Sequence, residues 1–209
     1  DNGISKGKAT STKNLKYSDQ VQGKEKKTNS SSNSDLDIPS YRKSGKIAKE
    51  VKEFALKLIK PQLKLVDIAD KIEEKIIELG GQPAFPVNLC INEIAAHDTP
   101  KYGDDRVASG LLKIDFGVAA NGCICDVAFS LDLESSDENR RLIQASDKAL
   151  AEALKIIKKG QEISKIGGKI HGVITAQGFS PIRNLSGHEV SSYQIHAGIT
   201  IPNYDNGNE

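Results

Sequence analysis

Apolar side chains recur every three or four residues over two consecutive stretches of the chain, a pattern typical of amphipathic helices. The first stretch covers residues 41–60, and a proline follows it at position 61. Its apolar positions are Ile47, Val51, Phe54, Ala55, Leu58 and Ile59. The second stretch covers residues 66–79 and ends at the glycine pair 80–81, as helices commonly do. We therefore predict two successive helices.

The periodicity changes in the middle of the chain, where two apolar segments flank an Asn-Gly pair. The segments are residues 111–116 and 123–131, and Asn121 and Gly122 lie between them. Asn-Gly between two such runs is a strong signal for a β-hairpin. Residues 83–100, which contain three prolines, are predicted to form a long irregular loop, a kind of segment that often has a function.

Helical periodicity returns after the predicted hairpin. Ser135 or Ser136 can cap a helix that has apolar residues from 142 to 157 and ends at Gly160. A fourth helix is predicted from Ile163 to Ala176, and short strand-like pieces with turns follow it. The order helix, helix, strand, strand, helix, helix, strand indicates an α+β fold, with one unit followed by the start of a second copy.

The first part of the chain differs from the rest in composition. Residues 1–40 are rich in Ser, Lys, Asn and Gly and poor in large apolar side chains. Such a segment buries too little surface to offset the entropy lost on ordering, so we predict a disordered tail. Its lysines could contact ribosomal RNA or another polyanion, although a solvated linker is the simpler interpretation.

Charge, hydropathy and cysteine content narrow the class of protein. Lys and Arg number 29 and Asp and Glu number 28, which leaves a net charge of +1 and no general electrostatic case for nucleic-acid binding. No apolar run reaches the ~20 residues of a membrane helix, and no leader is recognised, so neither a membrane protein nor a secreted one is expected. The three cysteines do not suit a disulfide framework, which favours a reducing cytoplasm.

Two aspartates in the predicted hairpin are the first candidates for chemistry. Asp115 and Asp126 each interrupt an otherwise apolar strand. A turn centred on Asn121-Gly122 places Asp126 opposite Gly117 and diagonal to Asp115, and a turn one residue earlier places the two aspartates directly opposite. Both registers put the carboxylates on one face. Because like charges repel there, a cation, a shared proton or an arginine must compensate them, unless one aspartate faces solvent at the sheet edge. A divalent metal is the sharper interpretation.

Histidines are scarce, and their positions are therefore informative. His97 lies in the proline-bounded loop, whereas His188 and His196 lie within one short segment, GHEVSSYQIHAG. Each of them, taken alone, is more often structural than a ligand. We assign His171 no role. The cysteines have no zinc-ligand spacing, and we interpret them as small buried hydrophobes.

Three motifs occur in the order and at the spacing of a known enzyme family. They read AFPVNLCINEIAAHDTP, GLLKIDFGVAANGCICDVAFSLDL and NLSGHEVSSYQIHAGITIPNY. The chain resembles the methionine aminopeptidases over about residues 41–204, and the third motif resembles their type 2 branch, which is archaeal and eukaryotic. The resemblance implies a pita-bread fold, in which two pseudo-symmetric halves enclose a dinuclear metal centre. Residues 41–209 would then form the N-terminal half and part of the C-terminal half of the catalytic domain.

The resemblance also implies roles for residues of these motifs. Asp115, Asp126 and His188 would be ligands of two divalent metal ions, whether Co, Mn, Fe or Zn. His97 would contact the substrate near the scissile amide, and His196 would hydrogen-bond the peptide carbonyl or the tetrahedral intermediate. The family has an apolar pocket for the methionine side chain, and Phe85 and Ile94 are its expected lining residues here.

The implied activity is removal of the initiator methionine from nascent proteins by metal-activated water. Because two glutamates complete the family's metal site downstream of IPNY, we expect a partial chain that is inactive by itself. The expected partners are N-terminal Met-peptides and the ribosome, with no membrane, no specific nucleic acid and a monomeric state. The alternatives are a non-catalytic pita-bread relative that binds RNA or protein, and a related metallo-dipeptidase.

Overall fold

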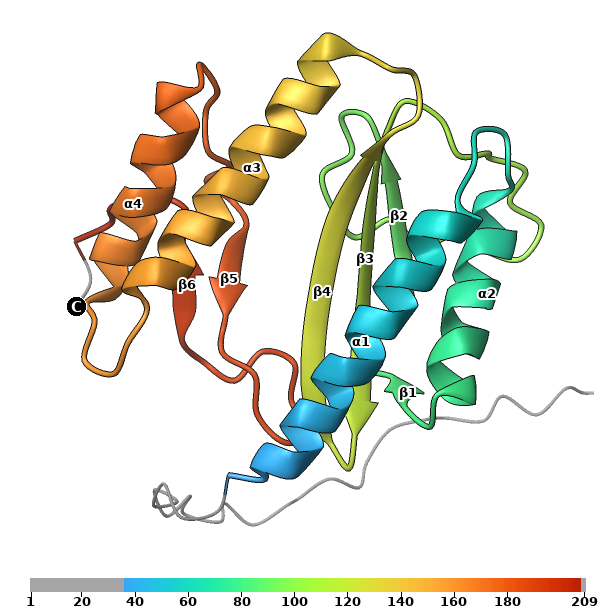
Figure 1. Ribbon diagram of the computed structural model, residues 1–209, viewed down its shortest axis with the longest axis horizontal. Coiled ribbons are helices and arrows are strands. Elements are labelled where there is room, and N and C mark those ends of the chain that lie inside the picture. Colours follow the sequence, from blue (N-terminus) through green and yellow to red (C-terminus); the bar gives the residue numbers. More distant parts are fainter. Residues whose placement is uncertain (1–35, 208–209) are drawn as a thin grey trace, which may run out of the picture. The chain divides into compact units, whose positions relative to one another are not determined.

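A four-stranded antiparallel sheet forms the centre of the first part of the structure. The computed structural model describes residues 36–207. Strand β3 (Leu111–Ala120) pairs with β4 (Cys123–Asp132) along one edge, and with β1 (Gln82–Pro83) and β2 (Asn88–Ile91) along the other. Helices α1 (Ile38–Leu58) and α2 (Leu65–Glu78) lie beside this sheet (Figure 1). Helices α1 and α2 therefore cover one face of the sheet and leave the other face uncovered by them.

The second part of the structure is smaller and follows the hairpin. Helix α3 (Asp137–Ile156) packs against α4 (Ile163–Ala176), and α4 packs against β6 (Thr200–Pro202). Strand β6 pairs with β5 (Ser186–His188) as a separate two-stranded sheet. The mixture of helices and antiparallel strands agrees with the predicted α+β fold (Figure 1).

Alternation along β3 separates the hydrophobic core from the polar face. Every second side chain of this strand is fully buried, namely Leu112, Ile114, Phe116 and Val118. They join the cluster formed by the apolar stripes of α1 and α2, which includes Val51, Leu65, Ile68 and Ile72. Because the side chains of a strand point alternately to its two faces, Asp115 lies on the face away from this core.

The helices lie where the periodicity predicts them, with small differences at their ends. Helix α4 has the predicted bounds, whereas α1 begins at Ile38, before the predicted start at Tyr41. The earlier start follows from Asp37, whose side chain accepts a hydrogen bond of 3.0 Å from the Ser40 amide and so caps the helix. The predicted tail lies outside the described residues over 1–35, and its last residues, from 38 to 40, belong to this helix.

The loop predicted over residues 83–100 contains a strand that periodicity did not reveal. Asn88–Ile91 pairs with β3 along its whole length, with Asn88 opposite Asp115. Four residues are too few to show an alternation, and Val87, Leu89 and Cys90 are all buried, so the segment has no polar face to mark it as a strand. The prediction of an irregular segment was wrong here, and the difference places Asn88 beside a candidate ligand.

The N-terminal cap of α3 provides a first test of local structure. Ser136 accepts a hydrogen bond of 3.3 Å from the Asn139 amide, whereas Ser135 lies outside the helix with a φ of 59°. We expect Ser136→Ala to lower the free energy of unfolding by about 1 kcal/mol, as loss of a serine cap typically does. Urea denaturation measures the effect, and Ser135→Ala is the matched control. An equal loss in both variants would contradict the assignment of the cap.

Two further features concern the helices and the cysteines. No helix within residues 36–207 is long and apolar enough to cross a membrane. Cys90, Cys123 and Cys125 are free thiols; the first two are buried, as predicted, whereas Cys125 is only partly buried.

Candidate metal centre

The two hairpin carboxylates lie on one face of the sheet, as the parity of the turn predicts. Asp126 pairs with Gly117 and Asp115 pairs with Ala128, so the two aspartates are diagonal neighbours. The turn is centred on Asn121-Gly122, the first of the two predicted registers. Burial raises the pKa of Asp115, and the neighbouring charge of Asp126 raises it further. The pair therefore resists ionisation unless positive charge is supplied.

One histidine from the second part of the structure contacts Asp126, and a second packs against the first. Nε2 of His188, at the end of β5, lies 3.2 Å from Oδ2 of Asp126. The ring of His196 meets that of His188 edge to face, with 4.3 Å between their centroids. Burial raises the pKa of Asp126, and the two histidines oppose that shift. The positively polarised partner of Asp126 is therefore a histidine and not an arginine.

A hydrogen-bond chain holds Asp115 from the other side. The Asn88 side chain, in a residue that is only 8% exposed, donates through Nδ2 to Oδ2 of Asp115 at 3.3 Å. The Thr99 hydroxyl donates to Oδ1 of Asn88 at 2.7 Å. Thr99 follows His97 by two positions, so the chain links the histidine loop to the carboxylate. Sequence reasoning missed Asn88 because it lay in a segment predicted to be irregular.

The loop that contains His97 has a fixed shape. His97 has a positive φ of 62°, a conformation that is uncommon for residues other than glycine and that concentrates at functional sites. Arg106 binds both oxygens of Asp98, at 2.6 and 3.0 Å, and also Asp104. Hydrogen bonds from Arg106 lower the pKa of Asp104 to about 2. These ion pairs fix the loop that follows His97.

The five residues assigned to metal binding and catalysis line one cavity. It has a volume of about 840 Å³, and its lining includes Asp115, Asp126, His97, His188 and His196. The lining also includes Cys90, Lys113, Ile143 and Leu150. Side chains from β3, β4, α3 and the two histidine segments therefore converge on one space, although they are far apart in the sequence.

The two residues predicted to line the methionine pocket are placed differently. Phe85 and Ile94 are not among the residues that line it. The Phe85 ring packs on Gly117, where an added Cβ would lie 2.5 Å from Cε1 of the ring, and Gly117 pairs with Asp126. Ile94 is 39% exposed. Their contact with a methionine side chain stays a prediction, and Phe85 is the better placed because its ring covers the strand next to a carboxylate.

The donor atoms at this site suit a divalent cation in kind. Carboxylate oxygens and an imidazole nitrogen are the ligands that Mn, Fe, Co and Zn accept. Burial raises the pKa of both aspartates, and the charge of Asp126 adds to the shift of Asp115, so a cation between them would relieve the repulsion. As they stand, no three His, Cys, Asp or Glu side chains within residues 36–207 are grouped closely enough to hold an ion. The expectation that Asp115, Asp126 and His188 bind metal therefore stays a prediction.

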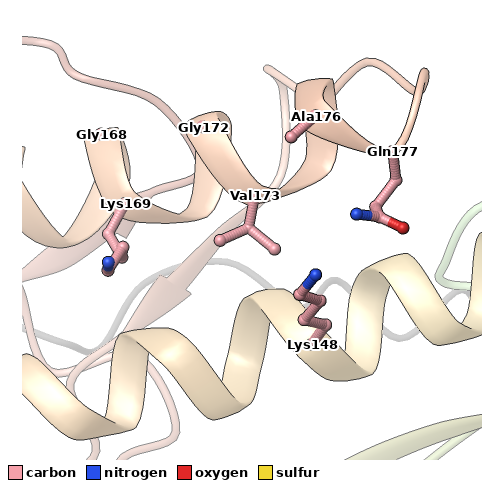
Figure 2. Close-up of a pocket in the computed structure, with 7 residues that line it drawn as sticks. All are labelled: Lys148, Gly168, Lys169, Gly172, Val173, Ala176 and Gln177. Carbon is pink, nitrogen blue, oxygen red and sulfur yellow. The ribbon is translucent and has the colours of Figure 1, made fainter.

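A second, smaller cavity of about 280 Å³ lies between α3 and α4 (Figure 2). Its lining residues are Lys148, Gly168, Lys169, Gly172, Val173, Ala176 and Gln177. None of them also lines the carboxylate cavity. It contains no acid–base pair or cluster of donors comparable with the hairpin site, so the chemistry is expected at the hairpin.

Comparison with known proteins agrees with the fold. A family model described as metallopeptidase family M24 matches residues 39–209, and the chain belongs to this family. A methionine aminopeptidase of Thermococcus onnurineus (strain NA1) is 50% identical over 165 residues, which are 77% of this chain and 55% of that protein. One of Methanothermus fervidus is 39% identical over 176 residues, which cover 78% of this chain and 94% of that protein.

Solved structures confirm the pita-bread fold. A methionine aminopeptidase from Thermotoga maritima superposes with a TM-score of 0.74 at 24% identity, covering 81% of this chain and 72% of that one. A prolidase from Pyrococcus furiosus has a TM-score of 0.71 at 23% identity, covering 80% and 51%. The chain spans little more than half the length of several curated relatives that it matches, as with the 55% of the Thermococcus onnurineus protein.

Proposed function

We propose that the complete protein removes the N-terminal methionine from nascent polypeptides by metal-assisted hydrolysis. The observation behind this proposal is the meeting of Asp115, Asp126 and His188 at one cavity that His97 and His196 also line. The family is one of metallopeptidases, and relatives that are 40–50% identical are methionine aminopeptidases. Residues 41–209 would be the N-terminal half and part of the C-terminal half of the catalytic domain.

The proposed ligands of two divalent ions are Asp115, Asp126 and His188, together with glutamates that would lie further along the chain. Such ions, whether Co, Mn, Fe or Zn, lower the pKa of a bound water and polarise the peptide carbonyl. Burial of the carboxylates would strengthen their attraction to these ions, because charges interact more strongly where water is excluded. Asn88 keeps the Asp115 carboxylate oriented toward the cavity through its 3.3 Å hydrogen bond.

The histidines would act on the peptide. His196, whose ring lies 4.3 Å from that of His188, would donate a hydrogen bond to the carbonyl oxygen as negative charge develops there. His97, on its own strained loop, approaches the same cavity from the opposite part of the structure, where it would contact the scissile amide. Phe85 and Ile94 would bind the methionine side chain.

The proposed activity indicates the substrates and the cellular location. Substrates would be peptides with an N-terminal methionine, met at the ribosome, and we propose a monomer that works in the cytoplasm, where free thiols such as Cys90 stay reduced. The 209-residue chain by itself is expected to be inactive, because three donors are too few for two ions.

Hydrolysis of the tripeptide Met-Ala-Ser tests the proposal. The reading frame is extended past Glu209, and the resulting protein is assayed with added Co²⁺ or Mn²⁺. We expect release of free methionine that depends on the metal and stops on chelation. Cleavage of an Xaa-Pro dipeptide in place of Met-Ala-Ser would indicate the dipeptidase alternative, and metal binding without either activity would indicate a non-catalytic relative.

A further inference from the structure

We propose that Tyr193 is a positioning residue, which holds His188 and His196 over the hairpin carboxylates by fixing their segment to the β3–β4 turn. The proposal rests on the proposed function, because it concerns the same metal site. It assigns a role to Tyr193 and Gly122, neither of which lines the cavity.

The two histidines belong to a compact arm between β5 and β6. Main-chain hydrogen bonds close its base, from the Glu189 amide to the Ile199 carbonyl at 2.8 Å and from the Ala197 amide to the Glu189 carbonyl at 2.9 Å. Ser191 and Gln194 pair near its tip, with reciprocal bonds of 2.9 and 3.0 Å. Because hydrogen bonds join the two sides of the arm both at its base and near its tip, displacement of the tip shifts the histidines at the base.

The tip of the arm rests on the hairpin turn. The Tyr193 amide donates a hydrogen bond of 2.8 Å to the Gly122 carbonyl. The Tyr193 ring covers Gly122 so closely that a Cβ added there would lie 2.3 Å from Cε2 of the ring. Tyr193 itself has a φ of 59°, which is a strained value for a bulky residue. Glycine at 122 is therefore required both by its own φ of 82° and by the ring above it.

The hairpin turn is itself held in place by a hydrogen bond to α1. The Asn121 side chain donates through Nδ2 to Oγ of Ser40 in α1 at 3.0 Å, and Ser40 is buried. Asp126 lies on β4, four positions after Gly122 of the turn. The arm is thus attached at two points of the hairpin, by Tyr193 at the turn and by His188 at Asp126.

A positioning role predicts an effect on the site that exceeds the effect on stability. Tyr193 is 82% exposed, so its ring contributes little buried apolar surface to folding. What its removal changes is the position of the arm. Residues that orient metal ligands typically change metal affinity by about 10–100-fold when they are replaced.

Calorimetric titration with Mn²⁺ tests the proposal on the extended protein. We expect Tyr193→Ala and Gly122→Ala to weaken Mn²⁺ binding by about 10–100-fold, and Tyr193→Phe to bind as the wild type does, because the ring and the amide make the contact. Gly80→Ala is the matched control. Gly80 has a φ of 78° with nothing within 4 Å of an added Cβ, so this variant adds backbone strain without touching the arm.

The outcomes separate this inference from the proposed function. Wild-type affinity in Tyr193→Ala, or an equal loss of affinity in Gly80→Ala, would overturn the positioning role while leaving the metal site in place. Failure of the wild type to bind Mn²⁺ would overturn both. A melting curve for each variant checks that the change in affinity occurs in folded protein.

Discussion

Asp115→Asn is expected to abolish methionine release by the extended protein and, in the metal-free state, to make the fold more stable. The change removes a proposed ligand while keeping the size of the side chain and a carbonyl oxygen for the Asn88 hydrogen bond. Activity should fall by more than about 100-fold, since even replacement of a residue that hydrogen-bonds a metal ligand typically lowers metal affinity or activity by about 10–100-fold.

The expected gain in stability follows from the direction in which the pKa of Asp115 is shifted. Burial and the Asp126 charge raise the pKa of Asp115 in the folded state above its ordinary value of 3.8. A group whose folded pKa is raised binds its proton more tightly when folded, so its contribution to stability is complete below the unfolded pKa and is lost as pH rises through the folded pKa. The metal-free wild type should therefore lose stability above about pH 4, and the asparagine variant should lose less.

Thermal unfolding of both proteins in the presence of a chelator, at pH values from 4 to 7, measures the difference. Asp105→Asn is the control, because the Asp105 side chain is 91% exposed and lies outside the cavity; it should leave activity and pH dependence unchanged. An Asp115→Asn protein that still releases methionine would refute the ligand assignment. A variant less stable than the wild type at pH 7 would refute the inference that the Asp115 charge destabilises the metal-free fold.

Phe116→Ala is expected to have the largest effect on folding. Phe116 is fully buried on the core face of β3, next to Asp115 in sequence but on the opposite face of the sheet. Truncating a buried phenylalanine removes its transfer free energy and leaves a cavity, at a cost of about 3–5 kcal/mol. That is a large share of the stability of a typical domain.

Urea denaturation followed by circular dichroism measures this cost. Ile77→Ala is the control, because Ile77 is 62% exposed on α2 and its truncation should change the free energy of unfolding by no more than about 0.5 kcal/mol. A loss below 1 kcal/mol in Phe116→Ala would mean that β3 does not form the centre of the core.

The hairpin shows how far local patterns reach. Asn121-Gly122 sets the turn, and a turn of known centre determines which residues share a face. The placement of Asp115 and Asp126 on one face could therefore be predicted without tertiary information. The same holds for α4, whose bounds follow from periodicity over Ile163–Ala176.

Other features could not be predicted because their cause lies in distant segments. Asn88–Ile91 is a strand only because β3 offers it a partner, and it has no alternation of its own. The role of Asn88 depends on that pairing. The contact of Tyr193 with Gly122 joins residues about seventy positions apart, and nothing in either local sequence indicates it.

The sequence by itself determined the fold class, the face of the hairpin that has the carboxylates, and the residues that match the aminopeptidase motifs. These depend on periodicity, on turn chemistry and on motif spacing, which are local properties of the chain. Only the tertiary structure decided that His188 meets Asp126, that Asn88 holds Asp115, and that Tyr193 rests on the turn. Each of those contacts forms because burial of the core brings separate segments together, and its geometry exists only once that packing is complete.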